Sequence, residues 1–175
     1  RSYNGAAPGN GKNIATAIAI DGAGNSYITG ESQLNGQTDV ITIKYSTTGT
    51  ELWVRRYDSN GSADRGNDIA IDAANNVYVT GYTNGTLIAN RAMLTVKYNT
   101  DGSELWVKED HSGMAQAIIL DDNANVYITG GTEELQATNF KTIKYNTNVE
   151  LQWKNDVAMY DEDDMLYFGR ATGIA

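Results

Sequence analysis

The 175-residue sequence contains no cysteine, a single proline (Pro8) and a single histidine (His111). Without cysteine the chain has no disulfide scaffold, and with one histidine it cannot assemble a zinc site from several histidine or cysteine ligands. No stretch approaches the roughly 18 consecutive apolar residues that a membrane-spanning helix requires. We therefore expect a fold held by its apolar core, with no cofactor and no membrane insertion.

Basic residues are also scarce. The chain has 13 lysines and arginines against 22 aspartates and glutamates, which gives a formal net charge of −9. Nucleic acids and anionic membrane surfaces are bound through basic patches. The charge balance therefore argues against both as partners.

One motif occurs three times along the chain. Its pattern is Asp-x-x-x-Asn-x-Tyr-(Ile/Val)-Thr-Gly, and it begins at Asp21, Asp72 and Asp121, so the copies lie 51 (72 − 21) and 49 (121 − 72) residues apart. The second half of each unit repeats as well, with a Lys-Tyr pair followed by tryptophan. Repeats of about 20 to 50 residues are typical of solenoids, propellers and arrays.

Each unit contains four short runs rich in β-branched and aromatic residues, bounded by turn residues. In the first unit these runs are residues 14–20, 26–30, 40–45 and 51–57. No run has helical spacing. We predict an all-β chain of β-propeller blades, each with four antiparallel strands.

The blades are expected at about residues 14–57, 67–110 and 114–160 of a single segment spanning 1–175. Residues 1–5 resemble the end of a blade, and residues 169–175 resemble the start of one. Propellers close with about four to eight blades. Two alternatives remain: a fragment of a longer propeller, which we favour because uncovered strand edges promote aggregation, or a six-bladed ring closed by two copies.

Turn chemistry within the units is also predictable. Residues 21–25 favour a tight hairpin, and residues 46–49 and 99–102 end on a glycine suited to left-handed backbone. The third copy, residues 146–149, lacks that glycine, so we expect strain or a different closure with Asn148 left-handed. The first strand of each unit is apolar on both faces, which predicts that it is covered on both sides.

The repeated residues resemble a known family. The segments Ala-Ile-Asp-x-x-x-Asn-Val-Tyr-Val-Thr-Gly, (Thr-Ile/Val)-Lys-Tyr and Gly-x-Glu-Leu-Trp are similar to the bacterial β-propeller repeat called SBBP, over nearly the whole chain. The resemblance implies bladed propellers in secreted or surface-attached bacterial proteins, some of them exported by the type IX pathway. It implies a scaffold and no shared catalytic residues.

Residues that recur in every unit are expected to serve every blade. We therefore assign a structural role to five recurring residue types. They are the aspartates Asp21, Asp72 and Asp121, the asparagines Asn25, Asn76 and Asn125, the tyrosines Tyr27, Tyr78 and Tyr127, the lysines Lys44, Lys97 and Lys144, and the tryptophans Trp53, Trp106 and Trp153. The lysine stems are expected to cover apolar surface while each ammonium meets an aspartate. The tryptophans are expected to pack between blades.

Function is expected where the units differ. The second-to-third strand links and the links between blades open on one face of a propeller, which we call the loop face; the constant hairpins lie on the opposite face. Candidate ligand-binding residues on the loop face are Glu31, Gln33, Asn35, Asp39, Tyr82, Asn84, Asn90, Arg91, His111, Glu133, Glu134 and Gln136. Their amide, acidic and aromatic side chains suit a polysaccharide or a protein loop.

The sequence contains one dense acidic run. Asp161, Asp163 and Asp164 form the only candidate cation site, but they lack calcium-hand spacing, so we predict no metal. Carboxylates from different blades, such as Glu31, Asp39 and Glu133, could form a glycosidase pair, although no spacing favours it.

The preferred hypothesis is a non-catalytic extracellular or cell-surface propeller that binds protein or glycan within a larger bacterial protein or assembly. The expected partners are the rest of its own propeller or a second protein chain, and a polysaccharide. One alternative is part of a propeller lyase or hydrolase with its active site over the channel. The other is a structural partner that pairs by edge-strand addition.

Overall fold

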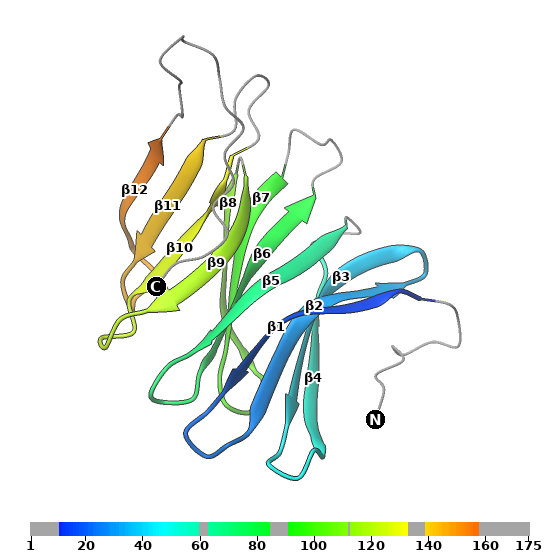
Figure 1. Ribbon diagram of the computed structural model, residues 1–175. Coiled ribbons are helices and arrows are strands. Elements are labelled where there is room, and N and C mark those ends of the chain that lie inside the picture. The colour runs from blue at the N-terminus through cyan, green and yellow to red at the C-terminus, as the bar shows by residue number, and fades with distance from the viewer. Residues whose placement is uncertain (1–10, 60–62, 85–90, 112, 133–138, 158–175) are drawn as a thin grey trace, which may run out of the picture.

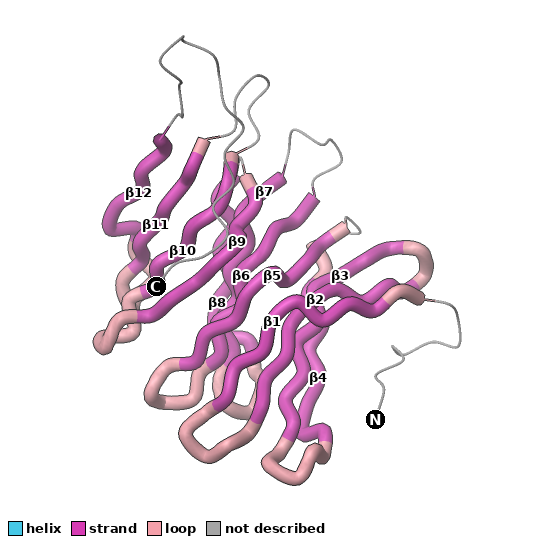
Figure 2. Tube along the Cα trace, viewed as in Figure 1, coloured by secondary structure: helices cyan, strands magenta, loops and turns pink. Residues whose placement is uncertain are grey.

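A computed structural model describes residues 11–59, 63–84, 91–111, 113–132 and 139–157. These residues form twelve strands in three four-stranded antiparallel sheets, and they include no helix (Figures 1 and 2). The predicted all-β class and the four-stranded blades are confirmed. The predicted partial blades at 1–5 and 169–175 lie outside the described residues.

The three sheets follow one another along the chain as three blades. Blade 1 comprises β1 (Asn13–Ile20), β2 (Ser26–Leu34), β3 (Gln37–Tyr45) and β4 (Glu51–Tyr57). Blade 2 comprises β5 (Asp64–Ile71), β6 (Val77–Asn84), β7 (Arg91–Tyr98) and β8 (Glu104–His111). Blade 3 comprises β9 (Met114–Leu120), β10 (Val126–Gly131), β11 (Phe140–Tyr145) and β12 (Leu151–Val157).

Within each blade the strands pair in chain order, so the first strand lies at one edge and the fourth at the other. The first strands β1, β5 and β9 lie next to one another, and the blades fan out from them (Figure 1). The hairpins that join the first strand to the second and the third strand to the fourth gather at one end of the fan, and the β2–β3 turn lies at the other end, on the expected loop face (Figure 2). This is the arrangement of adjacent propeller blades.

The blades stack through their apolar faces. We call the face toward the preceding blade the leading face and the face toward the following blade the trailing face. Between blades 1 and 2, Tyr27 and Trp53 pack against Val79 and Leu94, and between blades 2 and 3, Tyr78 packs in a second buried cluster. Each core therefore belongs to two blades.

The second strand of blade 1 is longer than the sequence indicated. The predicted runs 26–30 and 40–45 leave residues 31–39 as the variable link between the second and third strands, and this is wrong: β2 continues to Leu34, β3 begins at Gln37, and these two residues pair. Asn35 (φ 53°) and Gly36 (φ 87°) form the two-residue turn between them. An Asn-Gly pair with both residues left-handed matches the twist of a β-hairpin, which lets the strands continue to the turn.

The predicted coverage of the first strands depends on the blade. Ile69 and Ile118 are 6% and 3% exposed, whereas the equivalent Ile18 is 64% exposed. The expectation of a strand covered on both sides is therefore wrong for β1. Within the part of the chain that the structure describes, blade 1 has no preceding blade to cover it.

The third outer hairpin closes like the other two, through an unfavourable residue. Val149 has φ 67°, and its amide donates to the Asn146 carbonyl at 2.9 Å, as Gly49 and Gly102 do in their hairpins. The expected strain is present, but the expectation that Asn148 takes the left-handed position is wrong. The turn keeps its backbone hydrogen bond, but it places a β-branched residue in the left-handed conformation, which is sterically unfavourable.

Replacing Val149 by glycine is expected to raise the free energy of unfolding by about 1 kcal/mol, because it removes left-handed strain from an exposed turn. Urea denaturation of the two proteins measures the difference. Gly49→Val is the matched control, since nothing lies within 4 Å of a Cβ added there, so only backbone strain is introduced. It should destabilise by a similar amount; a stabilising Gly49→Val or a destabilising Val149→Gly would contradict this explanation.

Candidate functional site

The motif aspartate organises the inner hairpin of every blade. In blade 2 the Asp72 carboxylate accepts bonds from the Ala74 amide (2.9 Å), the Asn76 amide and side chain (both 2.8 Å) and the Tyr78 hydroxyl (3.1 Å). Asp21 and Asp121 make the same four contacts with their own neighbours. The structural role predicted for these residues agrees with this geometry.

The same contacts set the ionisation of the aspartates. Burial alone would raise the pKa of Asp72, but the hydrogen bonds from Asn76 and Tyr78 outweigh it and hold the pKa below the ordinary value. The pKa of Asp21 is lowered in the same way, and for Asp121 the Asn125 side chain is the largest cause of lowering. Hydrogen bonds that favour the charged form produce this shift.

The recurring lysines lie over the rings of the recurring tyrosines. Lys44, Lys97 and Lys144 stand 5.0, 4.6 and 4.7 Å from the centroids of Tyr27, Tyr78 and Tyr127. Lys97 also lies 3.8 Å from an Asp72 oxygen, as predicted, whereas Lys44 donates to the Thr100 carbonyl of the next blade at 3.1 Å. The lysines support the blades by cation–π contact, and the aspartate contact is one of several ways in which the ammonium is satisfied.

The tryptophans contact the next blade. Trp53 stacks edge-on against Tyr27, lies 6.2 Å from the Tyr98 ring of blade 2, and donates its indole N–H to the Thr100 carbonyl at 3.1 Å. It is 9% exposed, whereas Trp153 on the last described blade is 40% exposed. The predicted packing between blades is therefore observed for Trp53, whereas no described blade follows Trp153.

Three of the candidate ligand-binding residues come together on the loop face. Arg91 lies 5.3 Å above the Tyr82 ring, and it donates to the Asn84 side chain at 2.7 Å. A further guanidinium nitrogen contacts the Met114 sulfur of blade 3 at 3.2 Å. We call Tyr82, Asn84 and Arg91 the blade 2 cluster; it presents a partly exposed aromatic ring beside amide and guanidinium groups.

Two other candidates are committed to the scaffold. Glu31 is 8% exposed and lies 3.7 and 3.8 Å from Lys12 and Arg65, and Asp39 is 5% exposed and paired with Arg56. This pairing could not be predicted from the sequence, because Arg56 and Arg65 lie on β4 and β5 and Lys12 lies just before β1. Both carboxylates serve as internal ion pairs at the loop end of blade 1.

The remaining candidates are divided between the hairpin tip and undescribed positions. Asn35 is exposed in the β2–β3 turn, and Gln33 donates to the Gly36 carbonyl beside it at 3.4 Å. His111 ends β8. Asn90, Glu133, Glu134 and Gln136, and the acidic residues Asp161, Asp163 and Asp164, lie outside the described residues.

Comparison with known proteins agrees with this repeated architecture. A family model described as a β-propeller repeat, SBBP, matches residues 52–89, from β4 through β6. The chain carries the SBBP β-propeller repeat. An uncharacterised WD repeat-containing protein of Acanthamoeba polyphaga mimivirus is 30% identical over 137 residues, covering 67% of this chain. The chain spans only about 9% of the length of that relative.

A carboxylate cluster that the sequence analysis did not single out lies where SBBP blades 1 and 2 meet. Oxygens of Asp39, Asp58 and Asp64 lie within 4.8 Å of one another, close enough to share a cation. Arg56 already binds Asp39, and Ser59 donates to Asp64 through its amide (2.7 Å) and hydroxyl (3.0 Å). Protein donors therefore already engage Asp39 and Asp64, and the cluster carries no metal proposal.

A hollow lies on the hairpin face, opposite the loop face. The hairpins of blades 2 and 3 enclose about 460 Å³ lined by Asp72, Asp121 and Asp122. Asp72 and Asp121 are the motif aspartates whose oxygens are engaged within their own hairpins. No helix in the described part of the chain is long and apolar enough to cross a membrane.

The motif aspartates predict a loss of stability in acid. An aspartate in the unfolded chain has a pKa of about 3.9, and the motif aspartates have a lower pKa in the folded protein. Below about pH 4 the unfolded state therefore binds more protons than the folded state. Unfolding free energy should therefore fall as the pH drops from about 4 to 2. Asp72→Asn should make that dependence shallower and cost about 1 to 3 kcal/mol at pH 7, because the charge that its donors and Lys97 favour is lost.

Urea denaturation at pH values between 2 and 7 measures both effects. Asp101→Asn, at an exposed position of the outer hairpin of blade 2, is the matched control and should leave the curve unchanged. Equal pH dependence in the wild type and Asp72→Asn would show that the motif aspartate does not carry the acid sensitivity.

Proposed function

We propose that this chain is part of a non-catalytic propeller scaffold that binds a polysaccharide or a protein through its loop face, within a larger extracellular or cell-surface bacterial protein. The observation that carries the proposal is a division of labour among the residues. The repeated polar side chains make hydrogen bonds within and between blades, whereas the side chains that differ between blades lie at the loop end.

The blade 2 cluster is the best developed part of that face. The Arg91 guanidinium lies over the Tyr82 ring and donates a hydrogen bond to the Asn84 side chain. These contacts place an aromatic surface beside amide donors and acceptors. Aromatic rings flanked by amides suit ligands that are apolar on one face and rich in hydroxyl or peptide groups. Sugars and protein loops both have that character.

A hydrolase or lyase has less support from the described residues. The two described carboxylates considered for glycoside hydrolysis, Glu31 and Asp39, are buried and paired with basic side chains. Among the described residues, the carboxylates with a shifted pKa are the motif aspartates, whose pKa is lowered by structural hydrogen bonds. A general acid needs a pKa raised toward the working pH, which is the opposite direction.

The surface location and bacterial origin belong to the proposal through the SBBP resemblance. The absence of cysteine is compatible with export, and the acidic surface suits a partner without strong negative charge. The predicted partners are accordingly further blades or a second protein chain, and neutral or basic ligands at the loop face.

Binding is tested with immobilised polysaccharides (cellulose, chitin, mannan and alginate) and with outer-membrane protein extracts from Gram-negative bacteria as probes. Tyr82→Ala is expected to weaken retention about tenfold, because it removes the aromatic contact surface. Leu105→Ala is the control, since Leu105 is 51% exposed on the outer strand of the same blade. Equal effects of the two substitutions, or no retention on any probe, would contradict loop-face binding.

A further inference from the structure

Both described contacts between blades are bonded at the inner strands. We call the contact between blades 1 and 2 the first seam and the contact between blades 2 and 3 the second seam. Thr16 of β1 donates to a carbonyl of β5 across the first seam at 2.7 Å, and Asn67 of β5 donates to a carbonyl of β9 across the second at 2.6 Å. The second seam is also bonded at its loop end, where the buried Lys141 pairs with Asp110.

The two seams differ at the outer hairpins. In the first seam, three side chains of blade 1 bind the main chain of the blade 2 hairpin, residues 99–103. Lys44 and Trp53 donate to one carbonyl of that hairpin, both at 3.1 Å, and Arg55 donates to two further carbonyls at 2.5 and 3.2 Å. We call this set of bonds the latch. The acceptors are the carbonyls of Thr100, Gly102 and Asp101.

The second seam has no latch among the described residues. Strand register makes Lys97, Trp106 and Lys108 of blade 2 equivalent to the three donors of blade 1, and residues 146–150 form the outer hairpin of blade 3. None of these three side chains donates to a described residue of that hairpin. Lys97 instead lies 3.8 Å from the motif aspartate of its own blade. Trp53 is buried, whereas Trp106 is partly exposed.

One residue of the hairpin explains the difference. Gly102 and Val149 occupy the same position, since each amide donates to the carbonyl of the first residue of its turn. A Cβ added at Gly102 would lie 2.9 Å from Cδ2 of Trp53 and 3.1 Å from the guanidinium carbon of Arg55. Carbon atoms in contact prefer about 3.5 to 4.0 Å. Val149 carries such a Cβ, so it prevents Trp106 from binding the blade 3 hairpin as Trp53 binds the hairpin of blade 2.

Two further features weaken the hairpin end of the second seam. Arg55 reaches two carbonyls with its forked guanidinium, whereas the equivalent Lys108 has a single ammonium group. The inner hairpins of blades 2 and 3 also enclose the hollow of about 460 Å³, which Ile71 and Leu120 line. The hairpin end of this seam therefore lacks both the latch and close packing.

We infer that the second seam opens at its hairpin end, about a hinge formed by the β5–β9 contacts and the Lys141–Asp110 pair, while the latch keeps the first seam closed. Val149 determines which seam opens. Opening exposes apolar side chains such as Tyr78 and Ile128 while both sheets stay folded. This conformational device is independent of ligand binding at the loop face.

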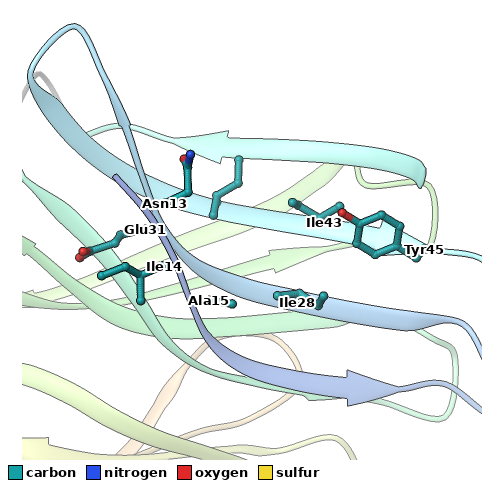
Figure 3. A pocket seen from close by; sticks show the side chains of 8 residues that line it. Asn13, Ile14, Ala15, Ile28, Glu31, Ile43 and Tyr45 are labelled. Atoms are coloured by element: carbon teal, nitrogen blue, oxygen red, sulfur yellow. The ribbon is translucent and has the colours of Figure 1, made fainter. Parts of the chain in front are cut away.

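Two equivalent buried positions report on the two seams. Val79 on the leading face of blade 2 is 0% exposed, and Ile128 on the leading face of blade 3 is 1% exposed. They are equivalent because they pair with Ile69 and Ile118 of their own blades. The equivalent Ile28 of blade 1 lines a pocket of about 200 Å³ (Figure 3), and no described blade faces it, so it reports on neither seam.

The test is the reaction rate of a thiol introduced at each position. The chain contains no cysteine, so Val79→Cys and Ile128→Cys each carry a single thiol. With a chromogenic aromatic disulfide as the probe under native conditions, the Ile128→Cys thiol should react about tenfold faster, because opening of the second seam breaks no latch. Urea denaturation of both variants checks that their global stabilities match. Equal rates in variants of equal stability would overturn the inference.

Grafting the latch onto the second seam tests its cause. In the Ile128→Cys background, Lys108→Arg combined with Val149→Gly should slow the thiol reaction about tenfold, because the blade 3 hairpin can then accept the arginine and Trp106. The matched control combines Lys108→Arg with Val149→Asn, since asparagine also tolerates left-handed backbone but keeps a Cβ. The control should react as fast as Ile128→Cys alone. Equal slowing by graft and control, or no slowing by the graft, would contradict the role of Val149.

The reverse change should open the first seam. In the Val79→Cys background, Gly102→Ala should speed the thiol reaction about tenfold, because the added Cβ displaces Trp53 and Arg55. Gly49→Ala introduces the same left-handed strain with nothing within 4 Å of its Cβ, so it should leave the rate unchanged. Circular dichroism shows that each variant keeps its sheets. Equal rates in these two folded variants would show that the latch does not hold the first seam.

Discussion

The structure depends on the burial of each blade's apolar face by the next blade. A four-stranded sheet of this size has two apolar faces and no helix to cover them, so a blade is stable only between neighbours. Trp53 illustrates the constraint: its ring fills the gap between blades, while its N–H satisfies a carbonyl in the neighbouring hairpin. The lysine above Tyr27 reaches the same carbonyl, so one turn of blade 2 holds two side chains of blade 1.

The same constraint explains why the repeated residues are polar as often as apolar. The motif aspartate fixes the inner hairpin and the tyrosine hydroxyl together, which sets the tyrosine ring in the position where the tryptophan and lysine meet it. The residues that repeat in the sequence are therefore those that connect the inner hairpin to the neighbouring blade. The residues of the loop face take no part in these contacts, and they differ between blades.

Much of the fold could be predicted from the sequence, because the repeat exposes what every blade needs. Strand number, strand order and the roles of the aspartates and Trp53 followed from period and turn chemistry. The length of β2 did not, although Asn35-Gly36 is a strong hairpin signal, because the polar residues before it were interpreted as a loop. Val149 was also missed, since propensity argues against a β-branched residue where the hairpin requires left-handed backbone.

The candidate site was less predictable than the fold. The sequence placed Tyr82, Asn84 and Arg91 on the correct face, but it could not show that Glu31 and Asp39 are buried in ion pairs, because their partners come from other strands. The ion pair between Lys141 of blade 3 and Asp110 of blade 2 was likewise not predictable, because the two residues lie on strands of different blades. Pairwise chemistry across an interface requires the register that the structure supplies.

Native-state hydrogen exchange of the 175-residue chain, measured residue by residue, tests the dependence of each blade on its neighbours most directly. Among the blades that the structure describes, blade 2 alone has a described blade on both faces, so the account predicts that amides of β6 and β7 exchange more slowly than the equivalent amides of β2 and β3 and of β10 and β11. Equal protection in all three blades, or slower exchange in blade 1, would contradict the claim that blade contacts hold this fold together.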